Sequence, residues 1–295
     1  MLSTLGTLPR RDKLRSVKSS EHSPEALDRL LDGEELSDDA IAGTFRVLQR
    51  VRGHRYSLDD VATAWEAAHA QPAAERVLDL GCGLGSVLTM LAWKLPEARL
   101  VGVEAQDISM ALAARNVARN RGLAARTTLV HGDLRDPAVL ARALAAGGPF
   151  DLVSGTPPYM PAGTATPSPD AQRAHARIEL RGGVEVYLDA MAVVLAPGGV
   201  GVVCCDARRP GRVLDHAVKV GLVCVRRRDV VPRAGVKGAL LTVFTCRRRE
   251  DAVDAPLVVE PPLVARDEGG ARTETAHDLR RFFDLAVDAG EPPSP

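Results

Sequence analysis

The apolar positions of this chain alternate between short continuous runs and longer stretches in which they recur every three or four residues. Short runs are typical of buried strands, and the longer spacing is typical of amphipathic helices. The strands predicted from this pattern span 77–80, 99–103, 126–130, 150–154, 200–205, 222–228 and 239–246. The helices predicted between them span 84–95, 107–121, 136–146, 171–181, 184–195 and 211–220.

The order of these segments predicts the fold class. Strands that alternate with helices favour a mostly parallel sheet covered by helices on both faces. Because crossovers between parallel strands are right-handed, the expected topology is doubly wound and Rossmann-like. We therefore expect an α/β fold with a seven-stranded, mostly parallel sheet, in which 222–228 and 239–246 form an antiparallel edge pair.

Shifts in composition divide the chain into three predicted parts. Residues 1–43 form a polar N-terminal extension, in which Ser23-Pro24-Glu25 indicates the start of a short helix. The core domain spans 44–249 and begins with a possible short strand pair over 44–57. Residues 250–295 form a tail rich in Pro, Asp and Glu, which we expect to pack on or near the core.

Composition and charge exclude several classes of protein. The formal net charge is +0, which gives no support to attraction of nucleic acid by the whole chain, although the basic clusters at 10–18, 226–228 and 247–249 permit a local phosphate-contacting surface. The five cysteines include no C-x-x-C pair and the seven histidines are scattered, so neither a disulfide framework nor a metal site is expected. No apolar run is long enough for a membrane span or a signal segment, which favours a cytoplasmic protein.

A glycine-rich loop joins the first predicted core strand to its helix. Its sequence is Asp79-Leu80-Gly81-Cys82-Gly83-Leu84-Gly85. Glycines there permit positive φ and close approach of a ligand to the backbone. A dinucleotide fingerprint, G-x-G-x-x-G, would need glycine at Ser86, so an NAD-dependent dehydrogenase is disfavoured. The D-x-G-x-G-x-G form instead resembles motif I of class I methyltransferases, which implies S-adenosylmethionine as the cofactor.

Acidic residues follow three successive strands of the predicted sheet. Asp79 is expected to bind the cofactor ammonium, directly or through water. Glu104 is expected to bind the ribose hydroxyls, and Asp133 the adenine amine. The predicted cofactor-binding residues are Asp79, Gly81, Cys82, Gly83, Gly85, Glu104, Ala105, Gln106, Asp133 and Leu134.

A second loop carries the candidate chemistry. Thr156-Pro157-Pro158-Tyr159 directly follows the fourth core strand and resembles the [DNS]-P-P-[YF] motif of amino-group methyltransferases. The lone pair of such an amine is delocalised, so a side-chain oxygen and a proline-backed carbonyl that accept its two N–H groups favour attack on the methyl group. Tyr159 is expected to stack on a planar substrate. The first position is Thr rather than Asn, Asp or Ser, and its hydroxyl offers one acceptor.

Taken in order, these motifs resemble the bacterial tRNA adenine-N6 methyltransferases. Residues 49–59, QRVRGHRYSLD, resemble the family's entry segment Q-x-x-x-G-x-R-[FY]-x-x-D, and Ala176-Arg177-Ile178-Glu179 resembles its A-R-x-E element. The resemblance covers about 45–246. It implies adenine in RNA, namely tRNA, as the substrate, Thr156 at the amine, and Arg55, Asp59 and Arg177 as substrate-binding residues.

Other functions remain open at this point. Enzymes with the same loop methylate the amide of glutamine in release factors or the N2 amine of guanine in ribosomal RNA. A different class of protein, which binds S-adenosylmethionine or RNA without catalysis, is compatible with the threonine at position 156. Arg173, His175, Arg177 and Arg181 form either the solvated face of a helix or a lid that contacts RNA phosphate.

Overall fold

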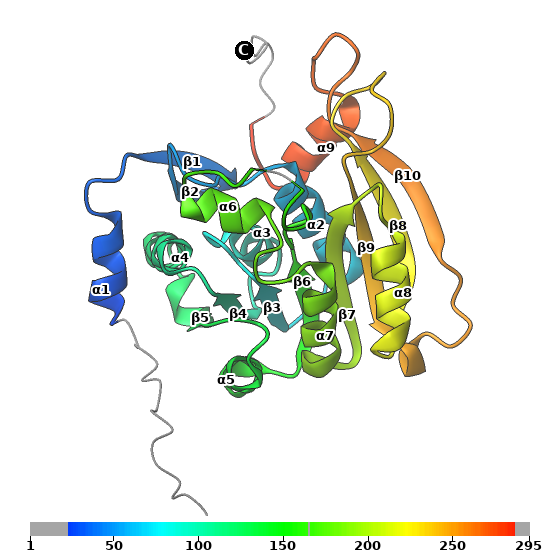
Figure 1. Ribbon diagram of the computed structural model, residues 1–295, viewed down its shortest axis with the longest axis horizontal. Helices are drawn as coiled ribbons and strands as arrows, with labels where there is room; N and C mark the ends of the chain where they lie inside the picture. The colour runs from blue at the N-terminus through cyan, green and yellow to red at the C-terminus, as the bar shows by residue number, and fades with distance from the viewer. Residues whose placement is uncertain (1–22, 165, 287–295) are drawn as a thin grey trace, which may run out of the picture.

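A computed structural model describes residues 23–164 and 166–286, and its centre is one eight-stranded sheet (Figure 1). The strand order is β10-β8-β9-β7-β6-β3-β4-β5. The strands span Arg76–Leu80 (β3), Arg99–Glu104 (β4), Thr127–His131 (β5), Phe150–Gly155 (β6), Leu195–Asp206 (β7), Leu222–Val231 (β8), Leu241–Arg248 (β9) and Val258–Val264 (β10). Strands β3 to β7 are parallel, and β9 runs antiparallel to both β7 and β8. The expected doubly wound, mostly parallel sheet is therefore confirmed.

Helices cover both faces of the sheet, as the alternating pattern predicts. One face packs against α2 (Leu58–Ala70), α3 (Ser86–Lys94) and α4 (Asp107–Arg119). The other packs against α5 (Pro137–Gly147), α7 (Val184–Val194) and α8 (Gly211–Lys219). Strand β7 shows the division residue by residue, because Val202 and Cys204 belong to the first core while Val203 and Cys205 belong to the second.

The eighth strand, β10, comes from the segment that the sequence assigned to a C-terminal tail. It pairs in parallel with β8 at the edge of the sheet, and its register shifts between Glu260 and Leu263. Pro261 and Pro262 lie within this irregular stretch, and an edge strand tolerates their missing N–H groups. The sheet thus has one strand more than the seven that we expected, because the two prolines disfavour a strand in the sequence pattern.

The basic cluster at 226–228 does not present free cations on a surface. Arg226 and Arg228 form ion pairs with Glu260, Arg228 also pairs with Glu66 of α2, and Arg227 pairs with Asp229. These arginines therefore join β8 to its neighbours instead of forming the phosphate-contacting surface that the sequence permitted. The cluster at 10–18 lies outside the described residues.

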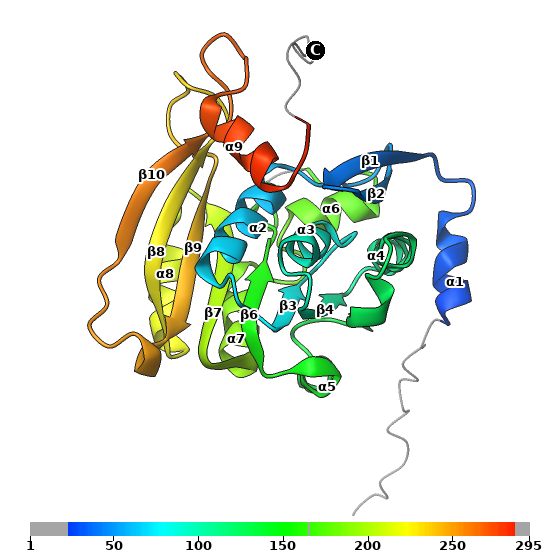
Figure 2. The ribbon, with the colours of Figure 1, turned by 180° about the vertical axis from the view of Figure 1, so that it is seen from behind.

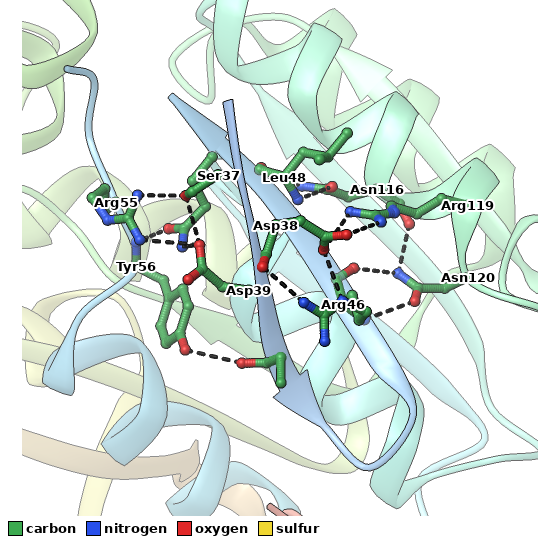
Figure 3. A network of polar contacts seen from close by, with 12 residues as sticks. Ser37, Asp38, Asp39, Arg46, Leu48, Arg55, Tyr56, Asn116, Arg119 and Asn120 are labelled. Atoms are coloured by element: carbon green, nitrogen blue, oxygen red, sulfur yellow. Dashed lines mark hydrogen bonds and ion pairs between the residues drawn. The ribbon is translucent and has the colours of Figure 1, made fainter. Parts of the chain in front are cut away.

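A hairpin of β1 (Leu36–Ala42) and β2 (Phe45–Arg50) precedes the core. The strand pair expected over 44–57 therefore occurs earlier in the chain, because the polar β1 carries little apolar signal. The hairpin docks on α4, where the amides of Asn116 and Asn120 bond to the backbone of Leu48 and Arg46 at 2.7–3.1 Å (Figure 3). These amides form hydrogen bonds with the backbone groups at the outer edge of β2, as a neighbouring strand would.

The described chain has three further α-helices, all of them short. They are α1 (Pro24–Asp28), α6 (Ala171–Arg177) and α9 (Glu274–Phe282). Helix α6 ends four residues before the predicted 181, and α9 packs beside α2 (Figure 2). Within residues 23–164 and 166–286, no helix has the length and apolarity to span a membrane.

Candidate active site

The carboxyl ends of β3, β4, β5 and β6 meet at one cavity. Parallel sheets place their ligand sites at this edge. Most of the predicted cofactor-binding residues line the cavity, and so do two residues of the predicted catalytic loop, Thr156-Pro157-Pro158-Tyr159. The lining includes Gly81, Cys82, Gly83, Glu104, Ala105, Gln106, Asp133, Leu134, Thr156 and Pro158. Two loops that lie about 70 residues apart in the sequence therefore line the same cavity.

The glycine loop wraps tightly around the start of α3. Gly81, Gly83 and Gly85 have φ values of +63°, +58° and +86°. The N–H of Cys82 donates to the carbonyl of Val103 at 2.9 Å, which fixes the loop to β4. A Cβ on Gly81 would lie 2.3 Å from the hydroxyl of Tyr187, so this position excludes any side chain. Gly85 is the N-cap of α3 and does not line the cavity.

Glu104 presents a fixed carboxylate to the cavity. It is buried, with an exposed fraction of 6%. One oxygen accepts the N–H of Gly83 at 2.9 Å and the other accepts the N–H of Gln106 at 2.6 Å. Each oxygen retains a second lone pair for a ligand hydroxyl. Burial nevertheless raises the pKa of Glu104, because these bonds only partly replace the lost water.

Asp79 lies behind the surface of the cavity. Its exposed fraction is 2%, and it accepts a hydrogen bond from the hydroxyl of Ser154 on β6 at 2.8 Å. Burial raises the pKa of Asp79 to about 7, and the nearby charge of Glu104 adds to the effect. A buried carboxylate in the cavity wall, Glu104, with a second one, Asp79, near it favours a ligand that carries positive charge. S-adenosylmethionine carries an ammonium and a sulfonium group, so the residues present fit this cofactor.

Asp133 lies at the far end of the lining, after β5. Its carboxylate pairs with Arg135 at 2.7 Å and approaches Arg181 at 3.6 Å. The side-chain bond from Arg135 keeps the pKa of Asp133 below its usual value. An ionised carboxylate that also borders the cavity can accept a hydrogen bond from an adenine amine.

The catalytic loop divides its side chains between two directions. Thr156 and Pro158 line the cavity. Tyr159 and Pro157 border a small hollow with Glu179 and Arg212, which Pro158 borders too, and neither Tyr159 nor Pro157 is among the residues that line the cavity. The stacking of Tyr159 on a substrate stays a prediction. Burial raises the pKa of Tyr159 to about 12.

The A-R-x-E element supports this loop from behind. The N–H of Met160 donates to the carbonyl of Arg177 at 3.1 Å, and the N–H of Glu179 donates to the carbonyl of Met160 at 2.9 Å. Arg212 of α8 then binds the carboxylates of Glu179 and Glu185 at 2.6 Å each. The Glu of the element is therefore an anchor for the loop, and the exposed side chain of Arg177 does not line the cavity.

Most of the entry segment serves to hold the hairpin. Arg55 donates to Ser37 at 2.6 Å and to Asp39 at 3.0 Å, outside the cavity (Figure 3). Asp59 accepts a hydrogen bond from the Ser57 hydroxyl and likewise does not line it. A Cβ on Gly53 would lie 2.3 Å from the amide oxygen of Gln172, which explains this glycine by close packing.

Sequence reasoning missed several residues that line the cavity. They are His54, Tyr56, Asp60, Ser86, Ser109 and Tyr187. His175 and Arg181, which the sequence left as either a solvated helix face or a lid, line the cavity as well. Asp60 is one position after the motif residue Asp59, and its carboxylate accepts the hydroxyl of Ser86 at 3.0 Å. Burial raises the pKa of Asp60 to about 8. A Tyr on a helix, such as Tyr187, gives no sequence signal for such a position.

The raised pKa of Asp79 predicts how cofactor binding depends on pH. Below pH 7 the carboxyl is largely protonated, and a cationic ligand must displace that proton. We therefore expect the dissociation constant for S-adenosylmethionine to fall by up to about tenfold per unit as pH rises from 5.5 to 7. Calorimetry in buffers of different ionisation enthalpy would measure the released proton, and Asp79→Asn should flatten the profile. A constant affinity across this range would contradict the assignment.

Known proteins place this site in a class. Residues 77–161 match the family model described as a methyltransferase domain. The release factor glutamine methyltransferase of Geobacter sulfurreducens is 36% identical over 141 residues, covering 45% of this chain and 46% of that protein. The tRNA1(Val) (adenine(37)-N6)-methyltransferase of Porphyromonas gingivalis is 31% identical over 139 residues, covering 46% and 52%. The matched segments thus span about half the length of these curated relatives.

Solved structures agree with the fold. A predicted O-methyltransferase from Agrobacterium tumefaciens superposes with a TM-score of 0.57 at 20% identity, covering 79% of this chain and 100% of that one. The family match and the fold agree: residues 77–161 match a methyltransferase domain, and the sheet and helices that contain them have the fold of this solved structure. Relatives of this chain include enzymes for adenine in tRNA and for glutamine in release factors.

Proposed function

We propose that this protein transfers the methyl group of S-adenosylmethionine to the N6 amine of an adenine in RNA, namely tRNA. One observation carries the proposal: Thr156 and Pro158, at the end of β6, border the same cavity as Glu104 and Asp133. Relatives that methylate adenine N6 in tRNA add weight to this substrate.

The residues divide the work by position. When bound, the cofactor supplies an electrophilic methyl group and leaves as a thioether. Glu104 and Asp133 hold its ribose and adenine, while the two buried carboxylates favour its positive charge. The Thr156 hydroxyl accepts one N–H of the acceptor amine and directs its lone pair at the methyl group. The amine loses one proton to solvent after transfer.

Basic side chains lie in the cavity wall and on the neighbouring helix α6. His175 and Arg181 line the cavity, and Arg173 and Arg177 are exposed on α6 or at its end. Guanidinium groups at such positions contact phosphate oxygens and orient a polynucleotide without reading its sequence. This arrangement favours RNA over a neutral acceptor.

Methylation of a glutamine amide in a protein is the second candidate. It is favoured by the release factor glutamine methyltransferases among the relatives, and the loop chemistry serves an amide nitrogen equally well. Transfer of labelled methyl to total tRNA, ribosomal RNA and a glutamine-containing release-factor peptide separates the candidates. Label recovered as N6-methyladenosine from tRNA supports the proposal. Label only in the peptide assigns a protein substrate, and label only in guanine assigns ribosomal RNA.

Thr156→Val tests the chemical role of the loop. Valine keeps the shape but removes the hydroxyl, so we expect kcat to fall by about tenfold to a hundredfold, with the affinity for S-adenosylmethionine unchanged. Thr156→Ser should retain most of the rate. Thr164→Val is the control, because it removes an exposed hydroxyl of the same loop that bonds only to the carbonyl of Pro161. A Thr156→Val variant with the wild-type kcat would rule out this role.

The non-catalytic alternative predicts a distinct outcome in the same assay. A protein that only binds the cofactor would show saturable binding of S-adenosylmethionine and no transfer to any acceptor. In that case Thr156→Asn, which restores a residue of the usual motif, is expected to produce transfer.

A further inference from the structure

A second cavity lies between α2, α9, β1 and the end of β10, and its volume is about 410 Å³. Helices α2 and α9 lie side by side there (Figure 2). Protein interiors have few voids larger than a water molecule, whereas ligand sites typically measure about 300–1,000 Å³. Among the described residues, only Tyr56 lines both this cavity and the first one. The second cavity is therefore a separate space, with the size of a small-molecule site.

Most of its wall is apolar. The side chains come from a strand and three helices that are distant in sequence, namely Ile41, Leu58, Val61, Met90, Leu279 and Phe283. Phe283 and Ile41 are almost fully buried, each with an exposed fraction of 1%. Such a wall favours an aryl or alkyl group through burial of apolar surface.

Among the described residues, the charged side chains that line this cavity are all basic. Arg266, Arg272 and Arg280 line it, and none of the described lining residues is acidic. Arg266 donates to the carbonyl of Gly270 at 2.8 Å, and Arg280 donates to the carbonyl of Ala286 at 2.8 Å. These carbonyls orient the guanidinium groups without neutralising their charge. An anionic group is the complement of this rim, and a carboxylate matches the guanidinium geometry.

We propose that this second cavity binds a small organic carboxylate with an aryl or alkyl body. The carboxylate lies between Arg266 and Arg280, and the body packs against Leu58, Leu279 and Phe283. The site is independent of the methyl-transfer proposal, since its recognition chemistry involves neither Glu104 nor Thr156.

Three probes of equal length test the charge requirement on the full chain by isothermal titration calorimetry. They are phenylbutyrate, phenylbutanol and phenylbutylamine, which share the body and differ in the end group. We expect phenylbutyrate to bind at least about tenfold more tightly than the alcohol, and the amine not to bind. Binding should persist with S-adenosylmethionine present. Equal affinities for the three probes, no binding of phenylbutyrate, or its displacement by S-adenosylmethionine would overturn the proposal.

Variants test the location. Arg266→Met and Arg280→Met, made separately, should each weaken phenylbutyrate binding about tenfold while leaving phenylbutanol unaffected. Ala276→Trp should fill the cavity and abolish binding of both. Arg281→Met is the matched control, because Arg281 is exposed on α9 and pairs with Glu274 and Asp278 away from the cavity. Thermal unfolding of each variant reports whether the fold is kept. Unchanged binding in both folded arginine variants would refute the site.

Discussion

Glu104→Gln is expected to weaken binding of S-adenosylmethionine by about a hundredfold. The carboxylate of Glu104 accepts two backbone N–H groups and keeps one lone pair on each oxygen for the ribose. A glutamine amide must turn its NH₂ group toward one of these donors, and it forms no charge-assisted bonds. Two such bonds contribute about 1.5 kcal/mol or more each, which corresponds to roughly two orders of magnitude in affinity.

Calorimetric titration of the cofactor measures this change directly. Glu97→Gln is the matched control, because the same substitution is made on an exposed side chain between α3 and β4. The control should bind the cofactor as the wild type does. An affinity of Glu104→Gln within threefold of the wild type would mean that the cofactor does not bind at the end of β4.

Arg228→Met is expected to lower the free energy of unfolding by about 3–5 kcal/mol. Arg228 forms an ion pair with Glu66, whose exposed fraction is 2%, and it also donates to the carbonyl of Pro261 at 2.7 Å. Its guanidinium lies over the ring of Trp65, 4.9 Å from the centroid. Removal of Arg228 leaves the Glu66 carboxylate buried on α2 without its counter-ion.

Urea unfolding measures this loss of stability, and two further variants show which interaction causes it. Arg226→Met removes the neighbouring ion pair between Arg226 and Glu260. The side chain of Arg226 is 39% exposed, so this variant should lower the free energy of unfolding by less than about 1 kcal/mol. Adding Glu66→Gln to Arg228→Met should recover part of the loss, because no buried charge remains unpaired. A loss below about 1 kcal/mol for Arg228→Met would show that Glu66 gains water or another partner.

The anchor of the catalytic loop shows why a motif residue need not touch the substrate. The sequence resemblance drew attention to residues 176–179, and the structure gives Glu179 a partner, Arg212, that no motif contains. The resemblance placed Arg55 and Asp59 near the substrate, but Arg55 bonds to Asp39 of the hairpin and Asp59 accepts the hydroxyl of Ser57. Their expected contact with the substrate remains a prediction for the assembled complex.

The sequence by itself determined the parts of this protein whose signals are local. Alternating apolar runs and helical spacing predicted the parallel strands and their helices. The loop from Asp79 to Gly85 predicted which edge of the sheet binds the cofactor. Its signal is local, because adjacent residues determine both the positive φ values and the strand–turn–helix context. Glu104 and Asp133 followed because parallel strands bring their carboxyl ends to the same edge.

Only the tertiary structure decided the features that depend on contacts between distant segments. Strand β10 forms because β8 offers an open edge, although Pro261 and Pro262 argue against a strand. Tyr187 and Asp60 line the cavity because α7 and α2 pack on opposite faces of the sheet and meet at its end. Local propensity cannot encode such contacts, since their free energy comes from packing and ion pairs that exist only once the sheet has formed.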